Sequence, residues 1–471
     1  GEAAGRMEQR VREDISFRGA MEVLAGVTAI LAGGTFILGL NIVVLLAACG
    51  GFTTWIFTRR YGFGWKFLFK EGVLPMFFRA SGALSILMSV GPLIAAWTLS
   101  GTIPYLVTAG LALLTPSLFL PSAFLLCCFA SLLTGTSWGT AATFGVALTG
   151  IAAGLGVPPE AAAGAIVGGA YFGDKLSPVS DTTVLAAAVA EVDVIDHIRS
   201  TLWTTMPGFV LSMAVYSIAG WGISGSIDPA RIEAVTSAIG GHFFLTPALL
   251  IPPFALLVMA WMRIPTLAAL WGSVALALPF ALFQGYGPLD ILSAMAAGPD
   301  ISTGVASVDD LLSRGGLLFL AGVAVVVCIA YVFAGQLEAT GTFRRTGTFL
   351  KERFIGESRG RFVFSVSVTG MVVAVGTGNS YLSEILPGTM YKKLADEMDI
   401  SRRVLSRTLE DSGTVIVPLV PWSAAAMYLT SVLGVPPSGY LPWAVICYTG
   451  FAAAWLYGFT GIALWPSEKK E

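Results

Sequence analysis

The sequence predicts an all-α polytopic membrane protein with two inverted-topology repeats, each built from scaffold helices, a re-entrant hairpin and a broken transmembrane helix. Three observations support this prediction: the apolar composition, the positions of Lys and Arg, and one pattern of polar interruptions that occurs twice. Of the 471 residues, 55% are hydrophobic and 12% are charged, which is about half the charged share of a soluble domain. Residues 80–159 contain no Asp, Glu, Lys or Arg. The mean hydropathy of the whole chain is +0.78. These values exclude a soluble enzyme and a secreted disulfide scaffold, and they indicate a lipid bilayer as the surroundings.

Neither the net charge nor the cysteines indicate a further partner. The net charge of −2 leaves no basic surface for nucleic acid. The five cysteines lie in apolar segments at spacings that fit neither a disulfide framework nor a metal site. The chain has only two histidines, and this small number argues against a histidine-based metal or haem site. We therefore expect no cofactor and no nucleic-acid partner.

Apolar segments of two kinds follow one another along the chain. A bilayer crossing needs about 20 apolar residues. Continuous windows of this kind cover 19–38, 41–58, 73–98, 201–222, 243–262, 264–285, 315–335 and 440–462. Four other apolar segments are interrupted by Gly, Pro, Ser and Thr, namely 118–156, 161–190, 362–390 and 408–433.

Lys and Arg accumulate on the cytoplasmic side of membrane proteins, so their positions predict the topology. Arginines before the first window and lysines after the last one place both termini in the cytoplasm. The basic clusters 344–361 and 392–407 flank segment 362–390, which is too short for two crossings of about 20 residues each. We therefore expect a hairpin that enters and leaves on the inner face, with its tip at 376–381. Segment 118–156 is its counterpart from outside, with its tip at 134–140.

Each predicted hairpin is followed by an interrupted helix, first at Gly173–Thr183 and again at Glu410–Trp422. Paired Gly- and Pro-interrupted segments in two halves indicate the binding site of a transporter. The chain is expected to begin with a cytoplasmic leader (1–18). The first repeat then comprises scaffold helices (19–117) and transport elements (118–200), and the second comprises linking and scaffold helices (201–361) and transport elements (362–439). A last helix with a cytoplasmic tail (440–471) follows.

The interruptions carry oxygen-bearing side chains. Backbone that leaves a helix inside the membrane must line a cavity or be buried in protein. Its freed carbonyls, together with hydroxyl and amide oxygens, suit a small cation, whereas half-helix N-termini favour an anion. The candidate cation- or substrate-binding residues are Thr136, Ser137, Ser177, Ser180, Thr182, Thr377, Asn379, Ser380, Ser412 and Thr414.

Charged residues inside the interrupted helices are candidates for proton and cation carriers. An ionised carboxylate at the bilayer centre costs at least ~2.5 kcal/mol, so it is normally paired or functional. The candidate carriers are Asp174, Asp181 and Asp411. Lys175 is the candidate charge partner, and in the structural alternative it neutralises an acid and locks the broken helix. Glu384 is either a second charge at the site or a cytoplasmic charge, and Glu410 is expected only to pair with Arg407.

Three strings resemble the NhaC-type sodium/proton antiporter family of the wider ion-transporter superfamily. They are Leu133–Thr140 (LTGTSWGT), Gly169–Thr183 (GAYFGDKLSPVSDTT) and Leu405–Thr414 (LSRTLEDSGT). The motif order is similar to that of the family from about residue 65 to residue 462. The second hairpin departs from the family pattern, because Ser380 is a shorter polar residue than the family often has there and Glu384 adds an acid.

The resemblance implies a secondary active transporter, not an enzyme, that exchanges Na⁺ for H⁺ across a bacterial inner membrane. It further implies alternating access by an elevator-like movement, a homodimer, and intramembrane aspartates that hold Na⁺ and H⁺ in turn. The Na⁺ ligands it implies are Thr136, Ser137, Asp181, Asn379 and Ser412.

Two alternatives remain open at this point. Relatives of malate/lactate type exchange organic acids, so an antiporter that couples Na⁺ or H⁺ to a small carboxylate or amino acid is the first. The second and more remote one is an intramembrane aspartyl protease, in which Asp174 and Asp411 would share a proton.

Overall fold

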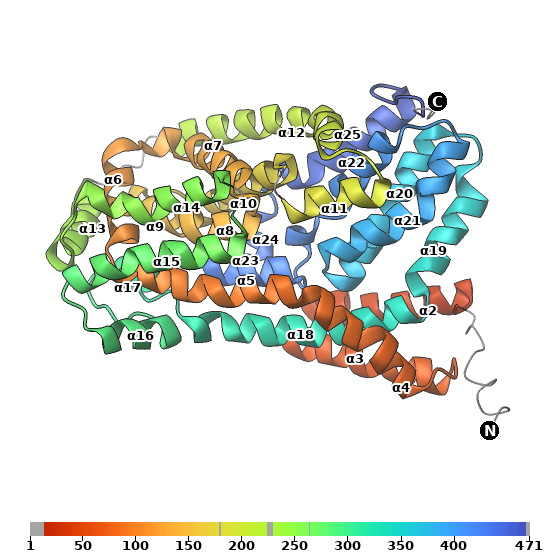
Figure 1. Cartoon of the computed structure of the whole chain (residues 1–471), viewed down its shortest axis with the longest axis horizontal. Helices are drawn as coiled ribbons and strands as arrows, with labels where there is room; N and C mark the ends of the chain where they lie inside the picture. Colours follow the sequence, from red (N-terminus) through yellow and green to blue (C-terminus); the bar gives the residue numbers. More distant parts are fainter. Residues whose placement is uncertain (1–13, 179, 224–228, 263, 468–471) are drawn as a thin grey trace.

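The computed structural model describes residues 14–178, 180–223, 229–262 and 264–467, and all regular structure within these ranges is helical (Figure 1). In this part of the chain, eight helices are long and apolar enough to cross a membrane, or up to eleven spans if each bent pair counts as one. The all-α polytopic fold is therefore confirmed. Residues 1–13 and 468–471, which carry several of the basic residues used to orient the termini, lie outside the described ranges.

Long apolar helices form one edge of the molecule. Figure 1 shows α5, α15 and α18 side by side along this edge. Gly72 and Gly335 allow a close backbone contact, because a Cβ atom added at Gly72 would lie 2.6 Å from the Gly335 carbonyl oxygen. The helices of this part are α2 (Phe17–Thr28, continued by a π-helical stretch Ala29–Ile37), α3 (Ile42–Arg59), α4 (Trp65–Phe67, followed by a π-helical stretch Leu68–Val73), α5 (Leu74–Leu99), α15 (Thr266–Phe283) and α18 (Leu317–Ala339).

Two sharp bends occur between successive helices of the described chain. The window predicted over 243–262 contains a 3₁₀ turn (Pro247–Leu250) continued by α14 (Ile251–Trp261), and this helix meets the preceding α13 (Pro229–His242) at 95°. Residues 243–246 lie outside any helix, and the next helical turn begins at Pro247, whose missing N–H costs nothing at a first helical position. A second bend, of 68°, separates α5 from α6 (Thr102–Leu113) at Gly101, whose φ is 86°.

Two helical hairpins have the same turn. In the first, α7 (Pro116–Thr134) leads through Gly135 into α8 (Ser137–Thr140), a π-helical stretch (Ala141–Gly145) and α9 (Val146–Leu155). In the second, α20 (Arg359–Thr377) leads through Gly378 into α21 (Ser380–Glu397). Gly135 and Gly378 adopt left-handed conformations, with φ of 65° and 62°, that a glycine accommodates without strain.

The hairpin arms are longer than expected. The second hairpin begins at Arg359 and ends at Glu397, beyond both ends of the predicted segment 362–390. Its first arm has 19 residues, or about 28 Å at 1.5 Å per residue, which is nearly the thickness of the hydrocarbon core. Entry and exit on one face of the membrane, and the opposite orientation of the two halves, remain predictions.

Both predicted helix interruptions are present. The first lies between α10 (Pro159–Leu176) and α11 (Asp181–Ala190), where Val179 is outside the described residues. The second lies between α22 (Arg402–Ser412) and α23 (Ala424–Leu433), with a bend of 49°. Ser180 and Ser423 cap the N-termini of the second halves.

The remaining helices cover these elements or connect them. α12 (Val194–Ile223) packs against α7, α22 and α25 (Ile446–Thr460), and exposed apolar side chains such as Trp203 and Ile218 face outward. Large apolar side chains on an outer surface are expected where that surface meets lipid. The short helices are α16 (Pro288–Ala297), α17 (Ala306–Leu312), α19 (Thr342–Leu350) and α24 (Pro437–Tyr440).

Candidate functional site

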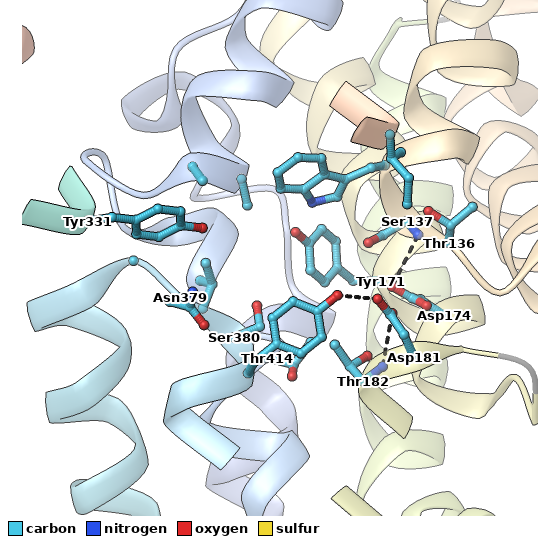
Figure 2. Close-up of a pocket in the computed structure, with 17 residues that line it drawn as sticks. Thr136, Ser137, Tyr171, Asp174, Asp181, Thr182, Tyr331, Asn379, Ser380 and Thr414 are labelled. Atoms are coloured by element: carbon cyan, nitrogen blue, oxygen red, sulfur yellow. Dashed lines mark hydrogen bonds between the residues drawn. The ribbon is translucent and has the colours of Figure 1, made fainter. Parts of the chain in front are cut away.

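A cavity of about 80 Å³ lies where the hairpin turns and the helix breaks meet (Figure 2). Its walls come from both halves of the chain, and the scaffold helices α5 and α18 contribute one residue each. The lining residues are Ile86, Thr136, Ser137, Trp138, Tyr171, Asp174, Asp181, Thr182, Tyr331, Gly378, Asn379, Ser380, Tyr381, Thr414, Val417, Ala424 and Ala425.

Two carboxylates form one side of the cavity (Figure 2). Asp174, at the end of α10, is 6% exposed, and its Oδ2 accepts a hydrogen bond from the Ser137 amide at 3.1 Å. Its second oxygen, Oδ1, is buried and has no hydrogen-bond partner. Asp181, at the start of α11, is exposed, and its Oδ1 accepts from the Thr182 amide at 2.9 Å. The Tyr381 hydroxyl donates to Asp181 Oδ2 and so connects the two halves of the chain.

Four helix N-termini point to the same region, because each begins at a polar capping residue beside the cavity. The side chains of Thr136, Ser180, Asn379 and Ser423 each accept a hydrogen bond from the backbone amide three residues later, at 3.2, 3.5, 3.0 and 3.0 Å. Such caps satisfy one of the orphan amides of each helix start. In the first half, the Ser137 and Thr182 amides of these helix starts donate to Asp174 and Asp181. Each half of the chain therefore has two helix starts with a polar N-cap beside the cavity.

Lys175 and Asp411 form a buried ion pair outside the cavity lining. Their side chains are 2% and 0% exposed, and the pair connects the end of α10 with the end of α22. Lys175 therefore contacts an acid of the other broken helix, which agrees with the structural alternative for this residue. Asp411 is the one candidate carrier that the structure pairs with a base in the described part of the chain.

The expected pair between Glu410 and Arg407 is wrong. Glu410 accepts hydrogen bonds from the Thr183 hydroxyl at 2.9 Å and lies 2.9 Å from His197 Nε2. The Arg407 guanidinium is buried without a hydrogen-bond partner and lies 5.3 Å from the centre of the Trp465 ring. The sequence did not predict these partners, because Glu410 and His197 are far apart in the chain and meet only where α12 packs against α22.

Glu384 is fully buried rather than part of a cytoplasmic vestibule. The Thr414 hydroxyl donates to its Oε1, and its Oε2 has no hydrogen-bond partner. Thr414 lines the cavity and Glu384 does not, so this acid lies behind the cavity wall.

The predicted polar residues divide into two groups. Thr136, Ser137, Asp174, Asp181, Thr182, Asn379, Ser380 and Thr414 line the cavity together. The remaining hydroxyls bind nearby main-chain or side-chain atoms outside the lining: Ser177 Oγ donates to Leu132 O, Ser180 Oγ contacts Thr182 Oγ1, Thr377 Oγ1 donates to Val373 O and Ser412 Oγ donates to Thr408 O. Of the five Na⁺ ligands implied by resemblance, Ser412 is the one outside the lining.

Four aromatic residues line the cavity that the sequence did not single out as ligands: Trp138, Tyr171, Tyr331 and Tyr381. Tyr171 lies within the string Gly169–Thr183, only three residues before Asp174, and this proximity was the available signal. Tyr331 lies on α18 without any motif around it. Trp138 also stacks on Tyr428, with ring centres 4.6 Å apart.

The lining has acids and neutral donors but no Lys, Arg or His among the described residues. A cavity with two carboxylates and no base attracts cations or protons. No set of three or more His, Cys, Asp or Glu side chains that could hold a metal ion occurs in the described ranges.

Comparison with known sequences identifies the family. Residues 25–201 and 169–462 match the profile of the Na⁺/H⁺ antiporter family. The chain belongs to this family. An Na⁺/H⁺ antiporter of NhaC type from Alkalihalophilus pseudofirmus is 34% identical over 419 residues, which cover 87% of this chain and 88% of that relative. The expected NhaC-type resemblance is thus confirmed, and the chain is an antiporter homologue with multiple membrane-spanning helices.

Other relatives of this antiporter homologue carry different substrate names. An arginine/ornithine antiporter from Halobacterium salinarum is 35% identical over 469 residues, covering 97% of this chain and 94% of the relative. A malate-2H⁺/Na⁺-lactate antiporter from Bacillus subtilis is 34% identical over 414 residues, covering 87% of each chain.

Proposed function

We propose that this protein is a secondary active transporter, not an enzyme, that exchanges Na⁺ for H⁺ across a bacterial inner membrane. The observation that carries the proposal is the pair of carboxylates, Asp174 and Asp181, in a cavity without a base between the two halves of the chain. A carboxylate in such surroundings is stabilised either by a bound cation or by a proton. Competition between Na⁺ and H⁺ for the same carboxylate oxygens then couples the movement of Na⁺ to the movement of protons.

Oxygen atoms around the two aspartates would complete the Na⁺ site. Ser137, Thr136 and Asn379 supply hydroxyl and amide oxygens on the same cavity wall. A hard cation such as Na⁺ prefers oxygen ligands of this kind. Asp411 is less suited to the carrier role than the other two aspartates, because Lys175 already neutralises it.

Alternating access requires the site to face each side of the membrane in turn. In the proposed mechanism the transport elements (118–200 and 362–439) move together past the scaffold (19–117 and 201–361). Among the described residues, the scaffold supplies Ile86 and Tyr331 to the lining, so most ligand contacts would travel with the moving part. The positions of Lys and Arg predict that both termini lie in the cytoplasm. The family resemblance leads us to infer a homodimer.

The protease alternative has no support from the arrangement of the aspartates. Its two acids would have to share a proton at close range. Asp174 lines the cavity, whereas Asp411 is bound to Lys175 outside the lining.

The test uses purified protein in liposomes with a pH-sensitive dye inside. Addition of Na⁺ should move protons through the wild-type protein, and Asp181→Asn and Asp174→Asn should each abolish this movement while the protein still reconstitutes. Asp300→Asn is the control, because Asp300 is an exposed acid outside the cavity lining and its substitution should leave exchange intact. Wild-type exchange in both cavity variants would refute the carrier assignment.

A further inference from the structure

We propose that Tyr381 sets the affinity of the site for Na⁺, because its hydroxyl group and the cation compete for one oxygen of Asp181. Tyr381 acts through Asp181, so it is a positioning residue and not a carrier. This inference rests on the proposed function, since it concerns Na⁺ binding at the same carboxylate. It follows from the hydrogen bonds of Asp181 and from the place of Tyr381 in the second hairpin.

Local sequence fixes where the Tyr381 side chain begins. Gly378 turns the hairpin with a φ of 62°, and the Asn379 side chain caps α21 by accepting a hydrogen bond from the Leu382 amide at 3.0 Å. Tyr381 is therefore the second residue of α21, and it lines the cavity. From this position in the second half of the chain, its hydroxyl donates to Asp181 Oδ2 at the start of α11 in the first half.

The two hydrogen bonds of Asp181 differ in how readily they can be exchanged. Oδ1 accepts from the Thr182 amide at 2.9 Å, and this donor is part of the α11 backbone. The donor to Oδ2 is a hydroxyl group on another helix, and its hydrogen turns away by rotation about the C–O bond alone. Oδ2 is thus the oxygen of Asp181 at which an incoming cation can replace a donor.

The bond between Tyr381 and Asp181 also lies where an ion can reach it. Asp181 is exposed, Tyr381 is half-buried, and both residues line the cavity. The side chains of Lys175 and Asp411, in contrast, are 2% and 0% exposed and lie outside the lining. An ion in the cavity therefore meets the Tyr381 hydroxyl at Asp181 without separating buried helices.

Competition between the hydroxyl and the cation has a definite sign. Both stabilise the ionised Asp181 carboxylate by bringing positive charge to its oxygens. With the hydroxyl hydrogen directed at Oδ2, a cation at the same oxygen meets a like partial charge, so Na⁺ binding costs the hydrogen bond. A hydrogen bond to a charged group contributes about tenfold to an equilibrium constant. Tyr381 should therefore weaken Na⁺ binding by about that factor.

A neutral donor at this place suits an exchange reaction. The cavity lining has no Lys, Arg or His among the described residues, so no base stabilises the Asp181 carboxylate when Na⁺ leaves it. The Tyr381 hydroxyl then takes the place of the ion at Oδ2 until a proton or another Na⁺ arrives. Because the hydroxyl has no net charge, an ion displaces it more easily than it would displace a lysine.

The test measures Na⁺ binding to purified Tyr381→Phe in detergent, a variant that loses the hydroxyl and retains the ring. A cation that binds the folded state raises the melting temperature as its concentration rises. At about pH 9, where protons compete little for a carboxylate, an equal rise in melting temperature should require about tenfold less NaCl in Tyr381→Phe than in the wild type, with choline chloride keeping the ionic strength constant. An unchanged NaCl requirement would overturn the proposal, and so would a higher one, because the hydroxyl oxygen would then be a Na⁺ ligand.

Tyr391→Phe is the matched control. Tyr391 lies on the same helix, and its buried hydroxyl donates to the Gly347 carbonyl oxygen at 3.1 Å, outside the cavity lining. Loss of this hydroxyl should lower the melting temperature in the absence of NaCl and leave the NaCl requirement unchanged. The same change in NaCl requirement in both variants would overturn the proposal, because any lost hydrogen bond on α21 would then account for it.

Failure of this inference is distinguishable from failure of the proposed function. In liposomes, Tyr381→Phe should retain Na⁺-driven proton movement with a lower half-saturating Na⁺ concentration, whereas Asp181→Asn should lose this movement. Stabilisation by NaCl that is equal in the wild type and in Tyr381→Phe would refute only the role of Tyr381. If NaCl stabilised the wild type no more than choline chloride does, the Na⁺ site itself would be refuted, and this inference with it.

Discussion

At the scale of single residues, the charged groups of the membrane region have distinct partners that suggest distinct tasks. Asp174 and Asp181 face the cavity, with only neutral donors around them. Lys175 and Asp411 neutralise each other behind it, and Glu410 binds His197 and Thr183. Charges that are fully matched inside protein hold elements together, whereas unmatched ones have capacity for a ligand.

The Lys175–Asp411 pair should behave as a structural lock. Replacement of one partner leaves the other charge buried and unpaired, which typically costs about 3–5 kcal/mol. Lys175→Met and Asp411→Asn should therefore each lower the thermal stability of the purified protein. The double variant should be more stable than Lys175→Met alone, because no buried charge remains unpaired. Additive losses in the double variant would show that the two charges do not depend on each other.

At the scale of secondary-structure elements, two hairpin turns and two helix breaks create the site. Each hairpin turns through a glycine with positive φ, followed directly by a polar cap. These caps and glycines are recognisable in sequence because they act over three or four residues. The arm lengths were less predictable, since the ends of α20 and α21 continue beyond the apolar segment into charged sequence.

Gly378 should be the more sensitive of two glycines with similar backbone angles. Its φ is 62°, and a Cβ atom there would lie 2.7 Å from Ser423 Cα, so alanine adds a backbone clash to the conformational strain. Gly62 has a φ of 69° with no atom within 4 Å of the added Cβ, so Gly62→Ala should cost only the strain, about 1 kcal/mol. Melting temperatures of the two variants test this expectation. Equal decreases in melting temperature for Gly378→Ala and Gly62→Ala would mean that α23 moves away from the turn at no cost in stability.

At the scale of the whole molecule, contacts between distant segments connect the two halves. Besides the buried pair, an exposed cluster connects Glu191, after α11, with Lys392 on α21 and Arg402 on α22. This cluster lies at the ends of helices whose other ends form the cavity. It should therefore help to hold α11 of the first half against α21 and α22 of the second.

This cluster predicts a dependence of stability on pH. Hydrogen bonds from Lys392 and Arg402 lower the pKa of Glu191 below its usual value of 4.5. A carboxylate with a lowered pKa in the folded state stabilises the protein above the pKa of the unfolded state, and this contribution disappears as the pH falls through the folded pKa. Below about pH 4.5, the wild-type protein should thus lose more of its melting temperature than Glu191→Gln. Glu352→Gln, at an exposed position outside the cluster, is the control and should follow the wild type.

The sequence by itself determined the features that depend on near neighbours. Apolar composition established the membrane class, and glycines and capping residues marked the two hairpins and two helix breaks that the structure contains. Packing between helices decided the rest: Lys175 binds Asp411 rather than the adjacent Asp174, Glu410 binds His197 rather than Arg407, and Tyr331 reaches the cavity from α18. Hydropathy and capping arise from interactions along a few residues of chain, so they are recorded in local sequence. The partner of a buried charge depends on which distant helix packs beside it, and only the tertiary structure determines that.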